Sequence, residues 1–173
     1  MIWQAEPVES FQEIRSFYWQ LIVDMAAVND RIGWKKGVYP SDDFLMESLE
    51  KGELYSLREG GQIVGAVILN SDCNEGYKGL PWSRELSAGN ILVPHALAVT
   101  PKRQNRGIGR QIMNHVLEIA RNRGKQAVRL DILGTNEQAE ALYRSVGFSF
   151  VAARNMYYPD TGWTEYKMFE LDL

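Results

Sequence analysis

The chain has 173 residues, of which 45% are hydrophobic, 24% charged and 11% aromatic, and its formal net charge is −3. This composition is that of an ordinary soluble globular protein, and the length suits one domain over 1–173. The acidic pI of about 5.5 argues against a general nucleic-acid binder. No apolar run approaches the roughly 18 residues of a membrane-spanning helix, so no membrane partner is expected.

The single cysteine, Cys73, excludes an intrachain disulfide framework and is interpreted as an incidental loop thiol. One unpaired thiol fits a reducing, cytoplasmic setting. The first residues contain no basic region followed by an apolar one, so we expect no signal peptide. The expected localisation is therefore cytoplasmic.

The first fifty residues predict a short strand and two helices. Residues 2–5 are predicted to form the strand, and from Val8 apolar residues recur at spacings of three and four, as in an amphipathic helix. The segment 29–40 breaks this pattern with two glycines and a proline. Ser41 then has the features of an N-cap for a short helix that ends at Gly52.

Three strands are predicted between residues 53 and 99. The stretches 53–59 and 62–69 flank Gly60-Gly61, which favours a hairpin. Residues 70–89 are predicted to form a loop. The mostly apolar stretch 91–99 indicates a central strand, in which Pro94 predicts a bulge or a distortion.

The remaining residues predict two helices and three strands. The first helix follows a glycine turn and ends at Gly124, and 127–133 is a strand. Thr135 and Gln138 form a T-x-x-Q capping box for a helix that ends at Gly147. Two antiparallel strands close the chain. The order β-α-α-β-β-β-α-β-α-β-β predicts an α/β (α+β) domain in which helices cover a mixed sheet.

The turn before the third predicted helix combines glycine with dense positive charge. Residues 101–125 carry seven bases, interrupted by one acid, Glu118. Unpaired N–H groups at a helix start attract anions, and Gly107 and Gly109 let the backbone approach a ligand closely. The turn is neither a Walker A loop nor a full G-x-G-x-x-G fingerprint. It predicts a phosphate-bearing ligand, with a plain helix start as the alternative.

Two motifs give the chain a family resemblance. Q-x-x-G-x-G, carried by Gln104, Gly107 and Gly109 directly after LAVTP, resembles the acyl-coenzyme A signature of the GNAT N-acetyltransferases. The pattern N-x-x-A-x-x-x-Y-x-x-x-G-F agrees, with the matching residues Asn136, Ala139, Tyr143, Gly147 and Phe148. The resemblance implies the GNAT fold: a mixed, mostly antiparallel sheet of about seven strands with about four helices.

The resemblance also implies a binding site for acetyl-CoA (coenzyme A) as acyl donor, without a metal. The backbone of the turn would hold the pyrophosphate, through Gln104, Asn105, Arg106, Gly107, Ile108, Gly109 and Arg110. The backbone of Leu97 and Val99 would pair with the pantetheine arm, and an amide near Leu97 or Ala98 would face the oxyanion. Asn136 and Ala139 would contact the arm. Tyr143 would act as general acid toward the sulfur, with core packing as the alternative.

The implied reaction transfers the acyl group directly to an amine, so a base must take the amine proton. Some family members carry a glutamate where this chain has Val93, so that role cannot be carried over. His95 is the possible base, although a lone histidine in an apolar strand is more often a core residue. Glu85 and Asp131 are weaker candidates, and a water chain is a further alternative.

The amine acceptor is expected to bind between the segments 29–43, 70–89 and 155–163. The substrate-binding candidates are Trp34, Tyr39, Glu85 and Tyr157. Trp82, Tyr158 and Trp163 lie in the same segments, and nearby acids could attract a cationic amine: Asp42, Asp43, Asp160 and Glu165. The alternative is that the aromatics anchor loops and the acids are solvated. A small amine, an amino acid, a peptide N-terminus and an aminoglycoside all remain open as acceptors.

Two other functions compete with the enzyme hypothesis. A catalytically silent coenzyme A binder, either a sensor or an interaction module, would keep the same glycine turn. A nucleic-acid binder could use the basic segment 101–125, but that segment lacks interleaved aromatic residues. We therefore expect an acyltransferase with an amine partner and no nucleic-acid partner, and leave a homodimer open.

Overall fold

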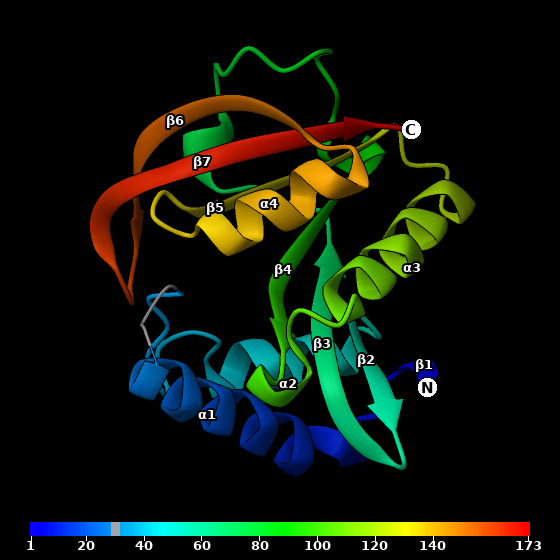
Figure 1. Ribbon diagram of the computed structural model, residues 1–173. Helices are drawn as coiled ribbons and strands as arrows, with labels where there is room; N and C mark the ends of the chain where they lie inside the picture. The colour runs from blue at the N-terminus through cyan, green and yellow to red at the C-terminus, as the bar shows by residue number, and fades with distance from the viewer. Residues whose placement is uncertain (29–31) are drawn as a thin grey trace.

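The computed structural model describes residues 1–28 and 32–173 (Figure 1). Within these ranges the strands are β1 (Ile2–Ala5), β2 (Leu54–Glu59), β3 (Gln62–Asn70), β4 (Ile91–Val99), β5 (Ala127–Leu133), β6 (Ser149–Tyr158) and β7 (Gly162–Asp172). The α-helices are α1 (Phe11–Val28), α2 (Asp42–Glu50), α3 (Ile108–Asn122) and α4 (Glu137–Val146). This order confirms the one that the sequence predicts. Residues 29–31 of the predicted acceptor segment lie outside the described residues.

The strands form one sheet in the order β1-β2-β3-β4-β5-β7-β6. Every neighbouring pair is antiparallel except β4 with β5, so the predicted mixed, mostly antiparallel sheet is confirmed. The parallel pairing joins only Ile91 to Ala127 and Leu92 to Val128. Beyond Leu92 the two strands diverge, and β4 bends away from β5 in Figure 1. The sheet therefore splits at its centre.

Strand β4 carries a bulge close to the point where it leaves β5. Ala66 pairs with Ala98 and Ile68 with His95, so two residues of β4 face the single residue Val67. Ala96, inside the bulge, has a φ of +50°. The carbonyl of Ala96 accepts a hydrogen bond from the buried Tyr18 hydroxyl at 2.9 Å. The predicted distortion of this strand is confirmed, two residues beyond Pro94.

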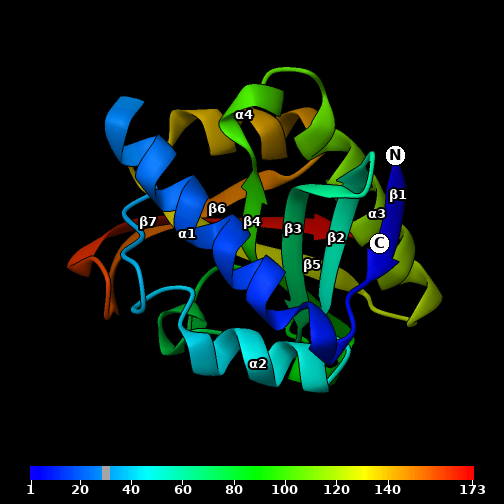
Figure 2. The same cartoon turned by 90° about the horizontal axis from the view of Figure 1, so that it is seen from below.

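Helices cover both faces of the sheet (Figures 1 and 2). Side chains alternate along β3, and this alternation divides the core. Ala66 and Ile68 pack with α1 and α2 in one apolar cluster. Val67 and Leu69 pack with α3 and with Tyr143 of α4 in the other. The β4–β5 split is thus enclosed by two packed layers.

The helix starts differ from the predictions in two places. The helix predicted from Val8 begins with a 3-10 turn, in which the Ser10 amide donates to the Pro7 carbonyl, and α1 starts at Phe11. The predicted capping box at Thr135 is wrong. Asn136 is the N-cap of α4, because its side-chain oxygen accepts from the Ala139 amide at 3.1 Å. The predicted cap of α2 at Ser41 is confirmed.

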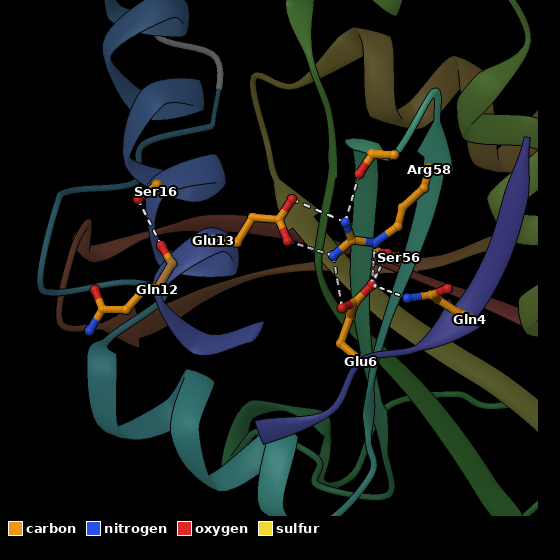
Figure 3. A network of polar contacts seen from close by, with 8 residues as sticks. Gln4, Glu6, Gln12, Glu13, Ser16, Ser56 and Arg58 are labelled. Carbon is orange, nitrogen blue, oxygen red and sulfur yellow. Dashed lines mark hydrogen bonds and ion pairs between the residues drawn. The ribbon is translucent and has the colours of Figure 1, made fainter. Parts of the chain in front are cut away.

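A polar network ties the N-terminal elements together (Figure 3). The Arg58 guanidinium, on β2, donates to the carboxylates of Glu6 and Glu13 and to the Gly61 carbonyl. The Ser56 hydroxyl also donates to Glu6, whose side chain is fully buried. Because Glu13 belongs to α1, one arginine joins the β2–β3 hairpin, the segment after β1 and the first helix.

Candidate active site

A cavity of about 350 Å³ opens where β4 and β5 separate. The β4 bulge and the end of β5 line it, together with the first turns of α4. Its other walls are the segments 32–39 and 72–74 and the β6–β7 hairpin end. Gly33 lies so close to the hairpin that an added Cβ would be 2.7 Å from the Thr161 methyl group. Two loops distant in the sequence therefore close one side of the cavity.

The glycine turn leaves a row of backbone donors unused. Gly107, with a φ of +78°, is the N-cap of α3, and the first helical residue is Ile108. Among the described residues, the amides of residues 105–110 have no hydrogen-bond acceptor. The α3 dipole adds positive potential at the same point. This end of the helix has the donors that a phosphate group needs.

The cations around this turn differ in whether they are already paired. Arg103 forms an ion pair with Glu59 of the β2–β3 hairpin. Lys102, Arg106 and Arg110 are exposed and form no ion pair within the described parts of the chain. Three of the four cations nearest the glycines are therefore free to meet an anion. The predicted charge cluster exists in space as well as in the sequence.

The two glycines of the turn have different roles. Gly107 faces open space, so its positive φ is what requires glycine there. A Cβ on Gly109 would lie 2.9 Å from a methyl group of Leu142, so Gly109 lets α3 approach α4. Gln104 fastens the turn to the sheet, since its side-chain amide donates to the Val99 carbonyl at 3.0 Å. Gly107 is therefore required by the backbone conformation of the turn, and Gly109 by the packing of α3 against α4.

The edge of β4 that faces β5 is open beyond Leu92. Residues 93–99 of β4 pair with β3 on one side, and their pairing with β5 stops at Leu92. Leu97, Ala98 and Val99 lie in this open stretch, which runs from the cavity to the glycine turn. An extended ligand could pair with this edge as an added strand.

Tyr143 projects from α4 into the cavity. Its ring packs edge-on against Phe148 with centroids 5.6 Å apart, so it also belongs to the core. Its hydroxyl has no hydrogen-bond partner in the described part of the chain. Burial, with a contribution from the Asp131 carboxylate, raises the pKa of Tyr143, so the hydroxyl stays protonated at neutral pH. Asn136 and Ala139 line the cavity beside it.

Asp131, on β5, is held by two tyrosines. The Tyr77 hydroxyl donates to one carboxylate oxygen at 2.6 Å, and the Tyr158 hydroxyl lies 3.1 Å from both oxygens. Asp131 is half-buried and lines the cavity. Burial raises the pKa of Asp131, while the two tyrosine hydrogen bonds act in the opposite direction. This carboxylate is a stronger base than an ordinary aspartate.

His95 also lines the cavity, but its surroundings do not favour a base. Its Nε2 atom lies 2.8 Å from the Asn70 side-chain oxygen, and its ring packs edge-on against Phe44. Burial lowers the pKa of His95 to about 4. A group with this pKa holds an amine proton poorly near neutral pH. These contacts therefore fit the alternative interpretation, in which His95 is a core residue with its hydrogen bond satisfied.

The acceptor candidates separate into two groups. Trp34 and Tyr39 line the cavity, whereas Glu85 lies on an exposed loop outside its lining. Tyr157 is 54% exposed and packs at a tilt against Trp163, which is 75% exposed, and both lie outside the lining. Alternation along β6 and β7 places these two side chains opposite those that face the cavity.

Two residues of this site were missed or ranked low from the sequence. Tyr77, which bonds Asp131 from outside the cavity lining, was missed, and Asp131 was only a weaker candidate for the base, although an acid inside the apolar stretch AVRLDIL is a detectable signal. The second polar residue of that stretch, Arg129, forms a buried ion pair with Glu170. Sequence alone could not tell the paired residue from the one that faces a cavity.

Comparison with known proteins decides the family. The sequence model of the Acetyltransferase (GNAT) family matches residues 9–148, which is most of the chain. The chain belongs to the GNAT acetyltransferase family. The glycine turn and the β4–β5 split described above are therefore features of a GNAT domain.

Curated relatives of this GNAT domain match it over part of their length. The N-alpha-acetyltransferase RimI of Mycobacterium tuberculosis is 42% identical over 74 residues, covering 43% of this chain and 45% of the relative. The [ribosomal protein bS18]-alanine N-acetyltransferase of Escherichia coli K12 is 37% identical over 65 residues, covering 38% and 44%. The chain spans less than half the length of the curated relatives it matches.

Solved structures share the whole GNAT fold at low sequence identity. YncA of Salmonella typhimurium, a structure with acetyl-CoA as its cofactor, has a TM-score of 0.74 at 18% identity, covering 100% of this chain and 94% of that one. The ribosomal-protein-alanine N-acetyltransferase of Brucella melitensis has a TM-score of 0.72 at 17% identity, covering 100% of both chains. These likenesses confirm the predicted fold class. In the described residues, no helix is long and apolar enough to cross a membrane.

Proposed function

We propose that this GNAT protein is an N-acetyltransferase that transfers the acetyl group of acetyl-CoA to a primary amine by direct attack on the thioester. The observation that carries the proposal is one continuous path. It runs from the free amides of residues 105–110, along the open edge of β4, to the cavity that holds Tyr143 and Asp131. Each part suits one part of the reaction.

The donor would occupy the first two parts of this path. Its pyrophosphate would accept hydrogen bonds from the amides of residues 105–110, and Lys102, Arg106 and Arg110 would balance its charge. Its pantetheine arm would pair with the backbone of Leu97 and Val99. This placement brings the thioester to the bulge of β4 beside Tyr143. The yncA structure with acetyl-CoA supports this choice of donor.

The chemistry needs three groups around the thioester. A neutral amine attacks the carbonyl carbon, and the oxygen that becomes negative needs a donor, a role that we propose for an amide near Leu97 or Ala98. The C–S bond then breaks, and the thiolate, with a pKa of about 8.5, is a good leaving group. Tyr143, whose pKa lies above that value, would stabilise the sulfur by a hydrogen bond and supply a proton as charge develops.

The names of the curated relatives suggest an acceptor class. One relative is an N-alpha-acetyltransferase, and the other acts on an alanine of ribosomal protein bS18. We therefore propose the α-amine at a protein N-terminus as the first acceptor to test. A free small-molecule amine is the second.

The test of this function combines binding and turnover. Calorimetric titration with acetyl-CoA should show one-to-one binding, and Gly107→Glu should abolish it by placing bulk and negative charge at the pyrophosphate site. Gly124→Glu is the matched control, because Gly124 also has a positive φ and open space but lies at the other end of α3. Free-thiol release with an amine panel then measures turnover. Binding without turnover of any amine would leave only a coenzyme A binder.

A further inference from the structure

Buried carboxylates in this protein fall into two classes. Glu6 is paired with Arg58, and Glu170 is paired with Arg129 at 2.6 Å. Asp160 is also buried and Asp131 is half-buried, but neither forms an ion pair with any other described residue. Both of these unpaired acids line the same cavity. Burying a charge without a partner is costly, so an arrangement of this kind calls for a cation from outside.

The walls of the cavity supply no such cation. None of its described lining residues is lysine or arginine. The side chains that bond Asp131 are the hydroxyls of Tyr77 and Tyr158, which fix the carboxylate without neutralising it. Lys35 acts electrostatically on Asp160 from outside the lining. The lining acids Asp72, Asp131 and Asp160 therefore make the electrostatic potential of the cavity negative.

The remaining walls suit the apolar part of an amine. Trp34 and Tyr39 stack edge-on with centroids 5.6 Å apart, and the rings of Tyr158 and Tyr166 lie 4.8 Å apart. All four line the cavity. Aromatic faces attract ammonium groups and exclude bulk water. A carboxylate carried by the same ligand would instead meet two uncompensated acids.

We propose that Asp131 binds the acceptor ammonium and accepts its proton, and that the cavity selects amines with no carboxylate on the adjacent carbon. This inference rests on the proposed N-acetyltransferase function and names the acceptor class for it. Protein N-terminal amines and simple amines belong to this class, and free amino acids do not. Tyr77 and Tyr158 are positioning residues that hold the Asp131 carboxylate toward the cavity.

The proton and electron balance of the step is complete within the site. One proton passes from the ammonium to Asp131 as the nitrogen lone pair forms the C–N bond with the thioester carbon. The C–S bond breaks and its electron pair leaves with sulfur. The second proton lost from nitrogen ends on the sulfur, giving the free thiol, and Asp131 releases its proton to solvent. Protein α-amines, with a pKa of about 7.7–8.0, need less driving force than alkylamines.

Paired acceptors and one variant test the proposal. Alaninamide with alanine, and tyramine with tyrosine, differ at the carboxylate. Calorimetric binding with coenzyme A present and thiol-release rates should both favour the member of each pair that lacks the carboxylate, by about tenfold or more. Asp131→Asn should lower kcat/KM by roughly 100-fold or more, because an amide accepts no proton. Asp172→Asn, on an exposed carboxylate outside the cavity, is the matched control.

Two results would overturn the proposal. Equal binding of both members of each pair would show that the cavity does not select against a carboxylate. An Asp131→Asn variant with near wild-type kcat/KM would show that Asp131 is not the base. Acetyl-CoA binding by Asp131→Asn, expected to be unchanged, shows that the variant is folded and its donor site intact. Failure of the wild-type protein itself to bind acetyl-CoA would instead refute the proposed function.

Discussion

At the scale of single residues, His95 and Asp131 face one cavity, yet burial acts on them in opposite directions. Burial disfavours the charged form of each group, so it lowers the pKa of His95 to about 4 and raises that of Asp131. The histidine is thereby a weaker base than in water and the carboxylate a stronger one.

His95→Gln should therefore keep most of the activity. The glutamine amide can still bond to Asn70, and the loss in kcat/KM should stay well below the roughly 100-fold expected when a general base is removed. Rates between pH 5 and 8 provide the check. Because the folded pKa of about 4 lies below this range, His95 stays neutral throughout, and the variant should follow the wild-type pH profile. A profile that loses an ionisation in the variant would restore His95 as the base.

At the scale of elements, the start of α4 combines a structural and a proposed binding role in one side chain. The Asn136 side-chain oxygen caps the helix, and the family resemblance implies that the same side chain contacts the pantetheine arm. Asn136→Ala should lower the free energy of unfolding by about 1 kcal/mol through loss of the cap. Asn136→Asp should keep the cap and the stability but weaken acetyl-CoA binding. Chemical denaturation and calorimetry separate the two effects. Normal acetyl-CoA binding by Asn136→Asp would show that the side chain serves only as the cap of α4.

The network around Arg58 makes the N-terminal elements sensitive to acid (Figure 3). Burial alone would raise the pKa of Glu6, but hydrogen bonds from Arg58 and Ser56 and the arginine charge lower it to about 2. A lowered folded pKa means that this stability is present above the ordinary value of 4.5 and is lost as the pH falls toward 2. The contribution is at most about 3 kcal/mol.

Denaturant unfolding of the wild type and Glu6→Gln measures this contribution. The difference in unfolding free energy should be large at pH 7 and should shrink steadily between pH 4.5 and pH 2. Glu47→Gln removes an exposed i,i+4 pair with Lys51 and should show little difference at any pH. A constant difference for Glu6→Gln would mean that packing, rather than charge, is what the substitution removes.

Local chemistry explains which elements the sequence predicts well. Apolar periodicity, the Gly60-Gly61 turn and the terminal glycines act over a few residues, so the helices and strands were found in their observed order. The capping residue of α4 was misplaced by one position, because Thr135 and Asn136 are both good caps.

The parts of the site that the sequence missed depend on long-range contacts. Tyr77 and Asp131 meet across 54 positions, and nothing local to either residue indicates the other. The donor motifs, in contrast, are short stretches whose backbone geometry is local. The position of the glycine turn before α3 could therefore be predicted from the sequence, whereas the walls of the cavity could be predicted only as segments.

At the scale of the whole molecule, the sheet consists of two parts joined by two parallel pairs of β4 with β5. A ligand that pairs with β4 and contacts α4 would bridge these parts. Acetyl-CoA at 100 times its Kd should stabilise the fold by about 2.7 kcal/mol, which corresponds to a rise in Tm of roughly 5–10 °C. Thermal unfolding with and without ligand measures it. Gly124→Glu should retain the ligand-induced rise in Tm, and Gly107→Glu should lose it. Equal rises in the two variants would show that acetyl-CoA does not bind at the turn around Gly107.

The contact between Gly33 and Thr161 has a consequence for re-engineering the enzyme. Because a side chain at 33 would collide with the Thr161 methyl group, the segment 32–39 and the β6–β7 turn are shaped to each other. Replacing one of these two loops with that of another GNAT protein, without replacing the other, would leave a clash or a gap between residues 33 and 161. The two segments would therefore have to be exchanged as a pair.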